Sequence, residues 1–185
     1  MRSLGPAAVP QLSTALHNNS VPIRCAAVEI LGSMRSYPDA VMPALGQALK
    51  DPNPEVRLKV VAALTDLGPK QTKVISLLIQ MLQDSDRGPD GSIVYVKEHA
   101  AQGLGMIGPE ARLAVPELTA LLSQTNSYTR QQAVIALWRI THDTNLVSNV
   151  VRELENAPDA MSRTISEIRN CIEPQAAKNA GVQMP

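Results

Sequence analysis

Two adjacent residues, Glu98 and His99, are the strongest candidates for chemistry in this sequence. A carboxylate beside an imidazole could transfer protons or bind a metal ion. The chain contains repeats, described below, and the equivalent pairs in the other repeats add no ligand: they are Cys25-Ala26, Leu58-Lys59 and Gln131-Gln132. One imidazole and one carboxylate are too few for a metal site held by protein alone. We therefore expect a solvated helix surface here and no metal.

The sequence offers no other catalytic group. It contains no nucleophile elbow, phosphate-binding loop, dinucleotide fingerprint or zinc-protease motif. Cys25 would be a reactive thiol only if its surroundings lowered its pKa, and an unreactive helical residue is favoured. Cys25 and Cys171 form neither a disulfide framework nor a CxxC motif. We predict a non-enzymatic protein with no cofactor, in a reducing compartment and hence in the cytoplasm.

Charge and composition exclude several classes of partner. The 185 residues include 17 basic and 17 acidic side chains, so no net positive field attracts nucleic acid or an anionic membrane. The chain has no Phe, one Trp and three Tyr, so its core must consist of aliphatic side chains, which suits thin helical layers. It contains no run of about 20 apolar residues, the length that spans a membrane. We expect neither nucleic acid nor membrane as a partner.

The residues that could act chemically are positioned by an internal repeat. Arg24, Arg57, Lys97 and Arg130 are separated by 33, 40 and 33 residues, and the same intervals separate Leu31, Leu64, Leu104 and Leu137. Within each unit, apolar residues recur at spacings of three and four, first before and then after a short polar break. Each unit is therefore predicted to be a pair of amphipathic helices, which needs neighbouring pairs to cover its apolar faces.

These patterns predict an all-α fold, an α-α superhelix or solenoid of about five antiparallel helix pairs. We assign residues 1–172 to a single solenoid and residues 173–185 to a C-terminal tail. The repeats are expected at about residues 5–35, 37–68, 69–108 and 109–141, with a divergent pair at 143–172. The start of the chain resembles the end of a second helix, so we expect an uncapped first repeat whose apolar surface permits self-association.

Local signals mark the ends of the predicted helices. Ser20, Asn53 and Asn126 share one column before the second helices, where a short polar side chain can cap the first turn. Gly68 and Gly108 end second helices and suit a left-handed cap. The single interval of 40 residues is explained by an insertion at residues 87–93, rich in Gly, Pro and Asp, which predicts an enlarged loop.

These units resemble the HEAT-repeat family, especially its bacterial branch named after phycobilisome lyases. The resemblance is carried by segments such as DAVMPALGQALKDPNPEVRLKVVAALTDLG and spans roughly residues 4–140. It implies a ladder of Asp and Arg side chains along the stack. Asp51 and Arg57 match that motif fully, Asp84 and Lys97 match in part, and Gln124 with Arg130 keeps only the basic residue. The resemblance also allows a role like that of bilin-attaching or bilin-isomerising subunits of light-harvesting proteins.

In stacked helix pairs, the second helices line the inner, concave face, where extended ligands bind. Helix register places a mixed and weakly charged set of residues on that face. We predict that this set contacts a protein or peptide partner; its members are Lys59, Glu98, His99, Gln102, Gln131, Gln132, Ile135 and Trp138. Trp138 has two interpretations, because it could anchor a partner or fill space against the last helix pair.

Three functions follow from this sequence. The favoured one is a non-catalytic protein-protein interaction or scaffold module that binds a protein or peptide on its concave face. The alternative is a bilin lyase or isomerase-like subunit acting on phycobiliproteins, which rests on resemblance of fold alone. DNA binding is a weaker third possibility, because the chain carries no net positive charge and has few aromatic residues for stacking on bases.

Overall fold

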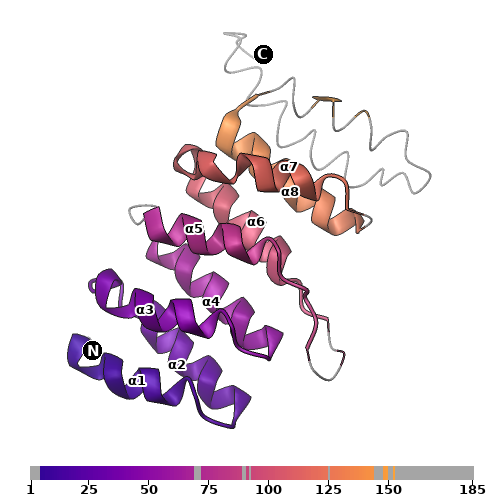
Figure 1. Ribbon diagram of the computed structural model, residues 1–185. Coiled ribbons are helices and arrows are strands. Elements are labelled where there is room, and N and C mark those ends of the chain that lie inside the picture. The colour runs from indigo at the N-terminus through magenta and orange to yellow at the C-terminus, as the bar shows by residue number, and fades with distance from the viewer. Residues whose placement is uncertain are drawn as a thin grey trace, which may run out of the picture.

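The computed structural model describes residues 5–68, 72–88, 91, 93–124, 126–143, 148–149 and 152. The described part is helical, as predicted, and Figure 1 shows the helices stacked in two layers from the N-terminal end upward. The helices are η1 (Pro6–Ala8), α1 (Val9–Ala15), α2 (Val21–Ser33), α3 (Pro38–Ala48), α4 (Pro54–Leu67), α5 (Thr72–Met81), α6 (Val96–Ile107), η2 (Gly108–Ala114), α7 (Val115–Leu121) and α8 (Ser127–Thr141).

The helices form an α-solenoid, which confirms the predicted fold class. In the described residues, α1 packs on α2, α3 on α4, α5 on α6 and α7 on α8, and the second helices α2, α4, α6 and α8 also pack on one another in sequence. The predicted divergent pair at 143–172 lies outside the described residues except for residues 143, 148, 149 and 152, and the predicted tail at 173–185 lies wholly outside them.

Two of the three predicted helix caps are present. The side chain of Asn53 accepts a hydrogen bond from the amide of Glu55, and that of Asn126 accepts from the amides of Tyr128 and Thr129. Ser20 stands at the same position before α2, but its side chain makes no capping bond, so that part of the prediction was wrong. The loop before α2 is closed instead by Asn18, whose side chain accepts from the amide of Ser20 at 2.9 Å.

The two predicted glycine caps occupy backbone conformations that other residues avoid. Gly68 ends α4 with φ 82° and ψ 177°, and Gly108 ends α6 with φ 80° and ψ −143°. Both have the expected positive φ, but their ψ values lie in the extended region and not in the left-handed helical one. That region is open essentially to glycine alone, because a Cβ atom clashes with the backbone there.

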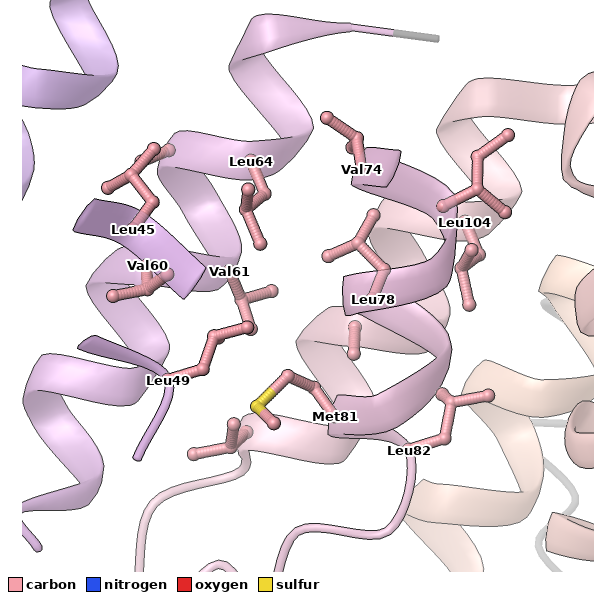
Figure 2. Packing of buried hydrophobic residues seen from close by; sticks show 14 of the residues in the cluster. Leu45, Leu49, Val60, Val61, Leu64, Val74, Leu78, Met81, Leu82 and Leu104 are labelled. Atoms are coloured by element: carbon pink, nitrogen blue, oxygen red, sulfur yellow. The ribbon is translucent and has the colours of Figure 1, made fainter. Parts of the chain in front are cut away.

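The core is a continuous aliphatic seam along the stack. Figure 2 shows its central part, where Leu45 of α3, Leu64 of α4, Leu78 of α5 and Leu104 of α6 face one another. The four leucines of the repeat column, Leu31, Leu64, Leu104 and Leu137, are each at most 1% exposed. The predicted leucine column therefore marks residues of the core between the two layers. The core contains few aromatic side chains and is filled by close packing of smaller aliphatic ones.

Small residues let neighbouring second helices approach closely. A Cβ atom placed on Gly32 would lie 2.6 Å from the Cβ of Ala63 and 3.1 Å from its Cα. A Cβ atom on Gly105 would lie 2.9 Å from the Cα of Ala136. These contacts are with backbone or with short side chains that cannot move aside, so glycine at these positions sets the spacing of α2 from α4 and of α6 from α8.

A ladder of buried ion pairs joins successive repeats, as the Asp and Arg motif implied. Arg24 donates to both carboxylate oxygens of Asp51, at 2.6 and 2.9 Å, and Arg57 donates to both of Asp84, at 2.6 and 2.8 Å. Hydrogen bonding to Asp51 raises the pKa of Arg24 above its ordinary value, so this pair stays ionised. Each arginine thus ties its own repeat to the loop of the next.

The same arginines also close the loops of their own repeats. Arg24 donates to the carbonyl oxygens of Asn18 and Asn19, and Arg57 donates to those of Asp51 and Pro52. Arg130 keeps the intrarepeat part of this arrangement, donating to the carbonyl oxygen of Gln124 at 3.2 Å. One guanidinium group therefore satisfies loop carbonyls and a neighbouring carboxylate together.

The ladder changes at the insertion. The next repeat has Gln124 where an aspartate would be needed, and Lys97 pairs with Asp86 instead, at 3.3 Å. Asp86 is 7% exposed, has a positive φ of 57°, and also accepts a hydrogen bond from the amide of Lys97 at 3.0 Å. The insertion is held by this pair and by an antiparallel bridge between Arg87 and Ile93. Residues 89, 90 and 92 of the loop lie outside the described residues.

The close approach of α2 and α4 predicts the effect of enlarging Gly32. We expect Gly32→Ala to lower the free energy of unfolding by about 1–3 kcal/mol, because the added methyl group overlaps Ala63. Gly46→Ala is the matched control, since its nearest neighbour is a flexible atom of Leu77 at an ordinary 3.9 Å, and it should leave stability unchanged or raise it. Urea unfolding followed by circular dichroism measures both. Equal stability of the two variants would contradict the close packing.

The ladder predicts that breaking a buried ion pair lowers the free energy of unfolding more than breaking an exposed one. Asp84→Ala leaves the guanidinium of Arg57, which is 7% exposed, without its carboxylate, and should cost about 3–5 kcal/mol of unfolding free energy. The control is Asp66→Ala, which breaks an exposed pair with Arg35 and should change stability by at most about 1 kcal/mol. Guanidinium chloride unfolding compares the two variants; similar losses would mean that the ladder is not a principal tie between repeats.

Candidate functional site

The second helices present a narrow exposed strip to solvent. Lys59 on α4 and both His99 and Gln102 on α6 are exposed, whereas Gln131, Gln132 and Ile135 on α8 are half-buried. We call these six residues the second-helix face. They come from successive repeats and lie on neighbouring helices, since α4 packs on α6 and α6 on α8. Their use by a partner remains a prediction.

Two residues predicted for this face are not on the surface. Glu98 is 1% exposed, so the expectation that it faces solvent was wrong, and Trp138 is 3% exposed, which favours the interpretation that it fills space. Among the described residues α4 and α6 each pack between two other second helices, so positions on the flanks of α6, such as Glu98, become buried by stacking. Trp138 makes an edge-to-face contact with His142, with ring centroids 5.8 Å apart. Neither residue is available as a direct partner contact in this structure.

Glu98 points between α6 and α8. Its Oε1 accepts a short hydrogen bond from the hydroxyl of Thr129, which is itself 2% exposed. Its Oε2 is buried and has no hydrogen-bond partner. In the preceding repeats the equivalent residues are Cys25 and Leu58, which are apolar or nearly so. Glu98 is therefore a polar substitution in a packed interface between helices, satisfied at one oxygen only.

Glu98 and His99 do not form a chemical pair. Glu98 is buried, whereas His99 is exposed and its Nδ1 lies 2.7 Å from the carbonyl oxygen of Tyr95, one turn earlier on the same helix. Adjacent residues of an α-helix point about 100° apart, which separates the two groups. Within the described part of the chain, no three His, Cys, Asp or Glu side chains gather in a way that could hold a metal ion.

Cys25 is half-buried, and its surroundings do not activate it. Burial raises the pKa of its thiol, and the nearby carboxylate of Glu55 raises it further. A thiol with a raised pKa stays protonated at neutral pH and is a poor nucleophile. This agrees with the interpretation of Cys25 as an unreactive helical residue.

Two depressions adjoin one another between the second helices. The first, of about 510 Å³, lies between α2 and α4 and is bordered by the exposed ion pairs Lys59–Glu29 and Arg35–Asp66. The second, of about 200 Å³, lies between α4 and α6, where Leu58, Val61 and Met106 give it an apolar lining. Ala62 and Asp66 border both. The two depressions therefore lie side by side across α2, α4 and α6.

The ion pairs that border the first depression are weak and accessible. Lys59 Nζ lies 2.5 Å from a carboxylate oxygen of Glu29, and this hydrogen bond raises the pKa of Lys59. Arg35 and Asp66 are 3.4 Å apart, and their side chains are 64% and 62% exposed. Exposed pairs of this kind contribute little to stability and can exchange partners easily.

One row of exposed residues, which occupy equivalent positions in successive second helices, was not predicted from the sequence. Asp66, Met106 and Arg139 occupy equivalent positions, separated by 40 and 33 residues, and all three are exposed. Met106 is 65% exposed, the largest value among the exposed large apolar side chains of the described residues. The repeat columns contained this signal, because the row lies one position beyond the column of Gly32, Thr65, Gly105 and Trp138.

Exposed apolar side chains also lie at the end of the predicted insertion and at the start of α6 and α8. Ile93, Tyr95 and Tyr128 are 57%, 45% and 39% exposed, and the two tyrosine rings meet edge to face with centroids 5.5 Å apart. Tyr95 immediately precedes α6, and Tyr128 lies in the first turn of α8. These residues lie at the loop edge of the solenoid.

Comparison with known proteins agrees with this architecture. Residues 9–93 match a family model described as HEAT repeats. A sequence search of curated proteins finds no match. Among the residues that the structure describes, no helix has the length and apolar character needed to cross a membrane.

Several solved structures share the fold. A computationally designed armadillo repeat protein for modular peptide recognition is 17% identical over 90% of this chain and 82% of its own, with a TM-score of 0.55. An engineered protein is 19% identical over 93% of this chain and 87% of its own, with a TM-score of 0.54. At such low identity these similarities show the fold alone. The complex of CpcE and CpcF of phycocyanin lyase from Nostoc sp. PCC7120 is 20% identical over 97% and 81%, with a TM-score of 0.49, too low to support an argument.

The half-satisfied carboxylate of Glu98 leads to a prediction about stability. Thr129→Val removes the one side-chain donor that bonds to the Glu98 carboxylate among the described residues, and should lower the free energy of unfolding by about 1–3 kcal/mol. Glu98→Leu combined with Thr129→Val should restore most of that loss, because the interface then becomes apolar, as it is at Leu58. Thermal and urea unfolding of the two variants and the wild type provide the test. A double variant less stable than Thr129→Val would contradict this account.

Proposed function

We propose that this chain is a non-catalytic scaffold that binds a protein or peptide segment on its second-helix face, and the match of residues 9–93 to a family model of HEAT repeats supports this class of function. The observation that carries the proposal is the pair of adjacent depressions across α2, α4 and α6. An exposed apolar residue, Met106, lies beside it and is available for contact. The designed armadillo relative recognises peptides, and the shared solenoid fold supports the same class of ligand.

The contacts that we assign are the members of the predicted set that are exposed or half-buried. Lys59, His99 and Gln102 lie along or beside the two depressions, and Gln131, Gln132 and Ile135 extend the face onto α8. Glu98 and Trp138 act indirectly, since both are buried and shape the helices that carry these contacts. Self-association through the first repeat is a separate prediction from the sequence. It is independent of the contacts assigned to the second-helix face.

No specific observation favours the alternative role on bilin chromophores. Such a role needs acid and base groups that converge on a pocket, yet Glu98 is buried and directed away from His99. Burial raises the pKa of Cys25, which disfavours a thiolate that could attack a chromophore. The scaffold function is therefore the one that the geometry supports best.

Site-specific cross-linking tests the proposed face. A photoreactive phenylalanine analogue at Gln102, beside the second depression, should yield a cross-linked product with a protein from the source cell lysate. The matched control places the same group at Gln80, which is exposed on α5 in the other layer, and should yield none. Mass spectrometry of the products identifies the partner. Equal products at both positions, or products at Gln80 alone, would exclude the second-helix face as the binding site.

A further inference from the structure

The row formed by Asp66, Met106 and Arg139 carries three different chemical groups across three neighbouring helices. Asp66 lies on α4, Met106 on α6 and Arg139 on α8, and these helices pack on one another in that order. The row therefore reads acidic, apolar and basic along the stack. We call it the acid–apolar–base row.

The space between Asp66 and Met106 can hold one apolar side chain. The depression beside Met106 has a volume of about 200 Å³, and Leu58 and Val61 give it an apolar lining. A protein cavity of about 150 Å³ is large enough for a benzene ring, so this space accommodates a large aliphatic or aromatic side chain. Such a group would cover Met106, which otherwise leaves most of its surface in water.

The ends of the row carry charges that can accept a ligand. The side chain of Asp66 is 62% exposed, and its pair with Arg35, at 3.4 Å, is long and solvated. Arg139 is exposed, and among the described residues no acidic side chain pairs with it. A ligand with a basic group at one end and an acidic group at the other would complement both.

Helix spacing sets the spacing of the ligand groups. Packed helices lie about 8–10 Å apart, and an extended peptide advances about 3.3 Å per residue. One repeat therefore corresponds to about three peptide residues. Asp66 lines the depression itself, whereas Arg139 lies one helix beyond Met106. We propose that the second-helix face, extended by this row, binds an extended peptide segment with a large apolar residue flanked, within about three positions on each side, by one basic and one acidic residue. This inference rests on the proposed function and specifies its ligand.

Either chain direction of the peptide satisfies the row. A peptide whose basic residue precedes the apolar one, and a peptide whose acidic residue precedes it, can both place their charges correctly by reversing direction. The decisive comparison is therefore between flanks of opposite charge and flanks of like charge. Like-charged flanks must place one charge against a residue of the same sign, which weakens binding.

Four fluorescent peptides test the proposal by anisotropy with the intact chain. Each has a central position flanked at three residues by charged positions, with Ala, Ser and Gly elsewhere. The Lys/Leu/Glu peptide should bind about threefold to tenfold more tightly than Lys/Leu/Lys or Glu/Leu/Glu. The Lys/Ala/Glu peptide should bind about tenfold more weakly than Lys/Leu/Glu, because the depression stays unfilled.

Charge reversal in the protein should change the preference in a defined way. Asp66→Lys should make Glu/Leu/Glu the tightest ligand, and Arg139→Glu should make Lys/Leu/Lys the tightest. Glu110→Lys, an exposed charge reversal on η2 outside the second-helix face, should leave all four affinities unchanged. Far-ultraviolet circular dichroism should show equal helicity in all variants, since every changed residue is exposed.

Two results would overturn the inference. One is binding without preference for opposite flanks, or a preference that Asp66→Lys fails to change. The other is no binding of any of the four peptides at concentrations up to about millimolar, the limit of weak specific association. Cross-linking at Gln102 does not depend on these charges, so it separates failure of the peptide pattern from failure of the proposed function.

Discussion

The stacking of second helices is the constraint on which the rest of the structure depends. No helix pair in this chain can cover its own apolar stripe, so α2, α4, α6 and α8 must pack on one another as well as on their first helices. The chain meets this requirement without Phe, using aliphatic side chains in the seam and glycine or alanine at the tightest contacts. Close backbone approach supplies the contact area that large aromatic side chains provide elsewhere, and it fixes the spacing between repeats.

The arginine ladder fixes how neighbouring repeats are positioned relative to one another. Aliphatic packing alone would let neighbouring repeats shift relative to one another. A guanidinium group that binds both oxygens of a carboxylate favours one geometry and therefore fixes the relative position of the two repeats. Arg24 and Arg57 each bind the aspartate of the following repeat and the loop carbonyls of their own. The ladder changes where Gln124 replaces the aspartate, next to the inserted loop. There Asp86 holds Lys97 locally, so the insertion stabilises its own repeat instead of joining it to the next.

The same stacking leaves only a thin strip of each second helix for function. Flank positions are buried against a neighbouring second helix, which is why Glu98 of α6 meets Thr129 of α8. What remains exposed is chemically mild and varies from repeat to repeat. A surface of this kind is consistent with the proposed recognition of an extended chain, in which each repeat would contribute a side-chain contact.

The sequence by itself determined the repeat, the helical fold and the aliphatic column of Leu31, Leu64, Leu104 and Leu137, because these depend on spacing along the chain. The arginine ladder was implied by the resemblance to HEAT repeats. The sequence also located the caps at Asn53 and Asn126, which act within one turn. Only the tertiary structure decided which polar residues stay in water. Helix register divides a single helix into a core side and a solvent side, but second helices such as α4 and α6 also pack against neighbouring second helices. That additional burial removed Glu98 and Trp138 from the predicted face and left Asp66, Met106 and Arg139 exposed.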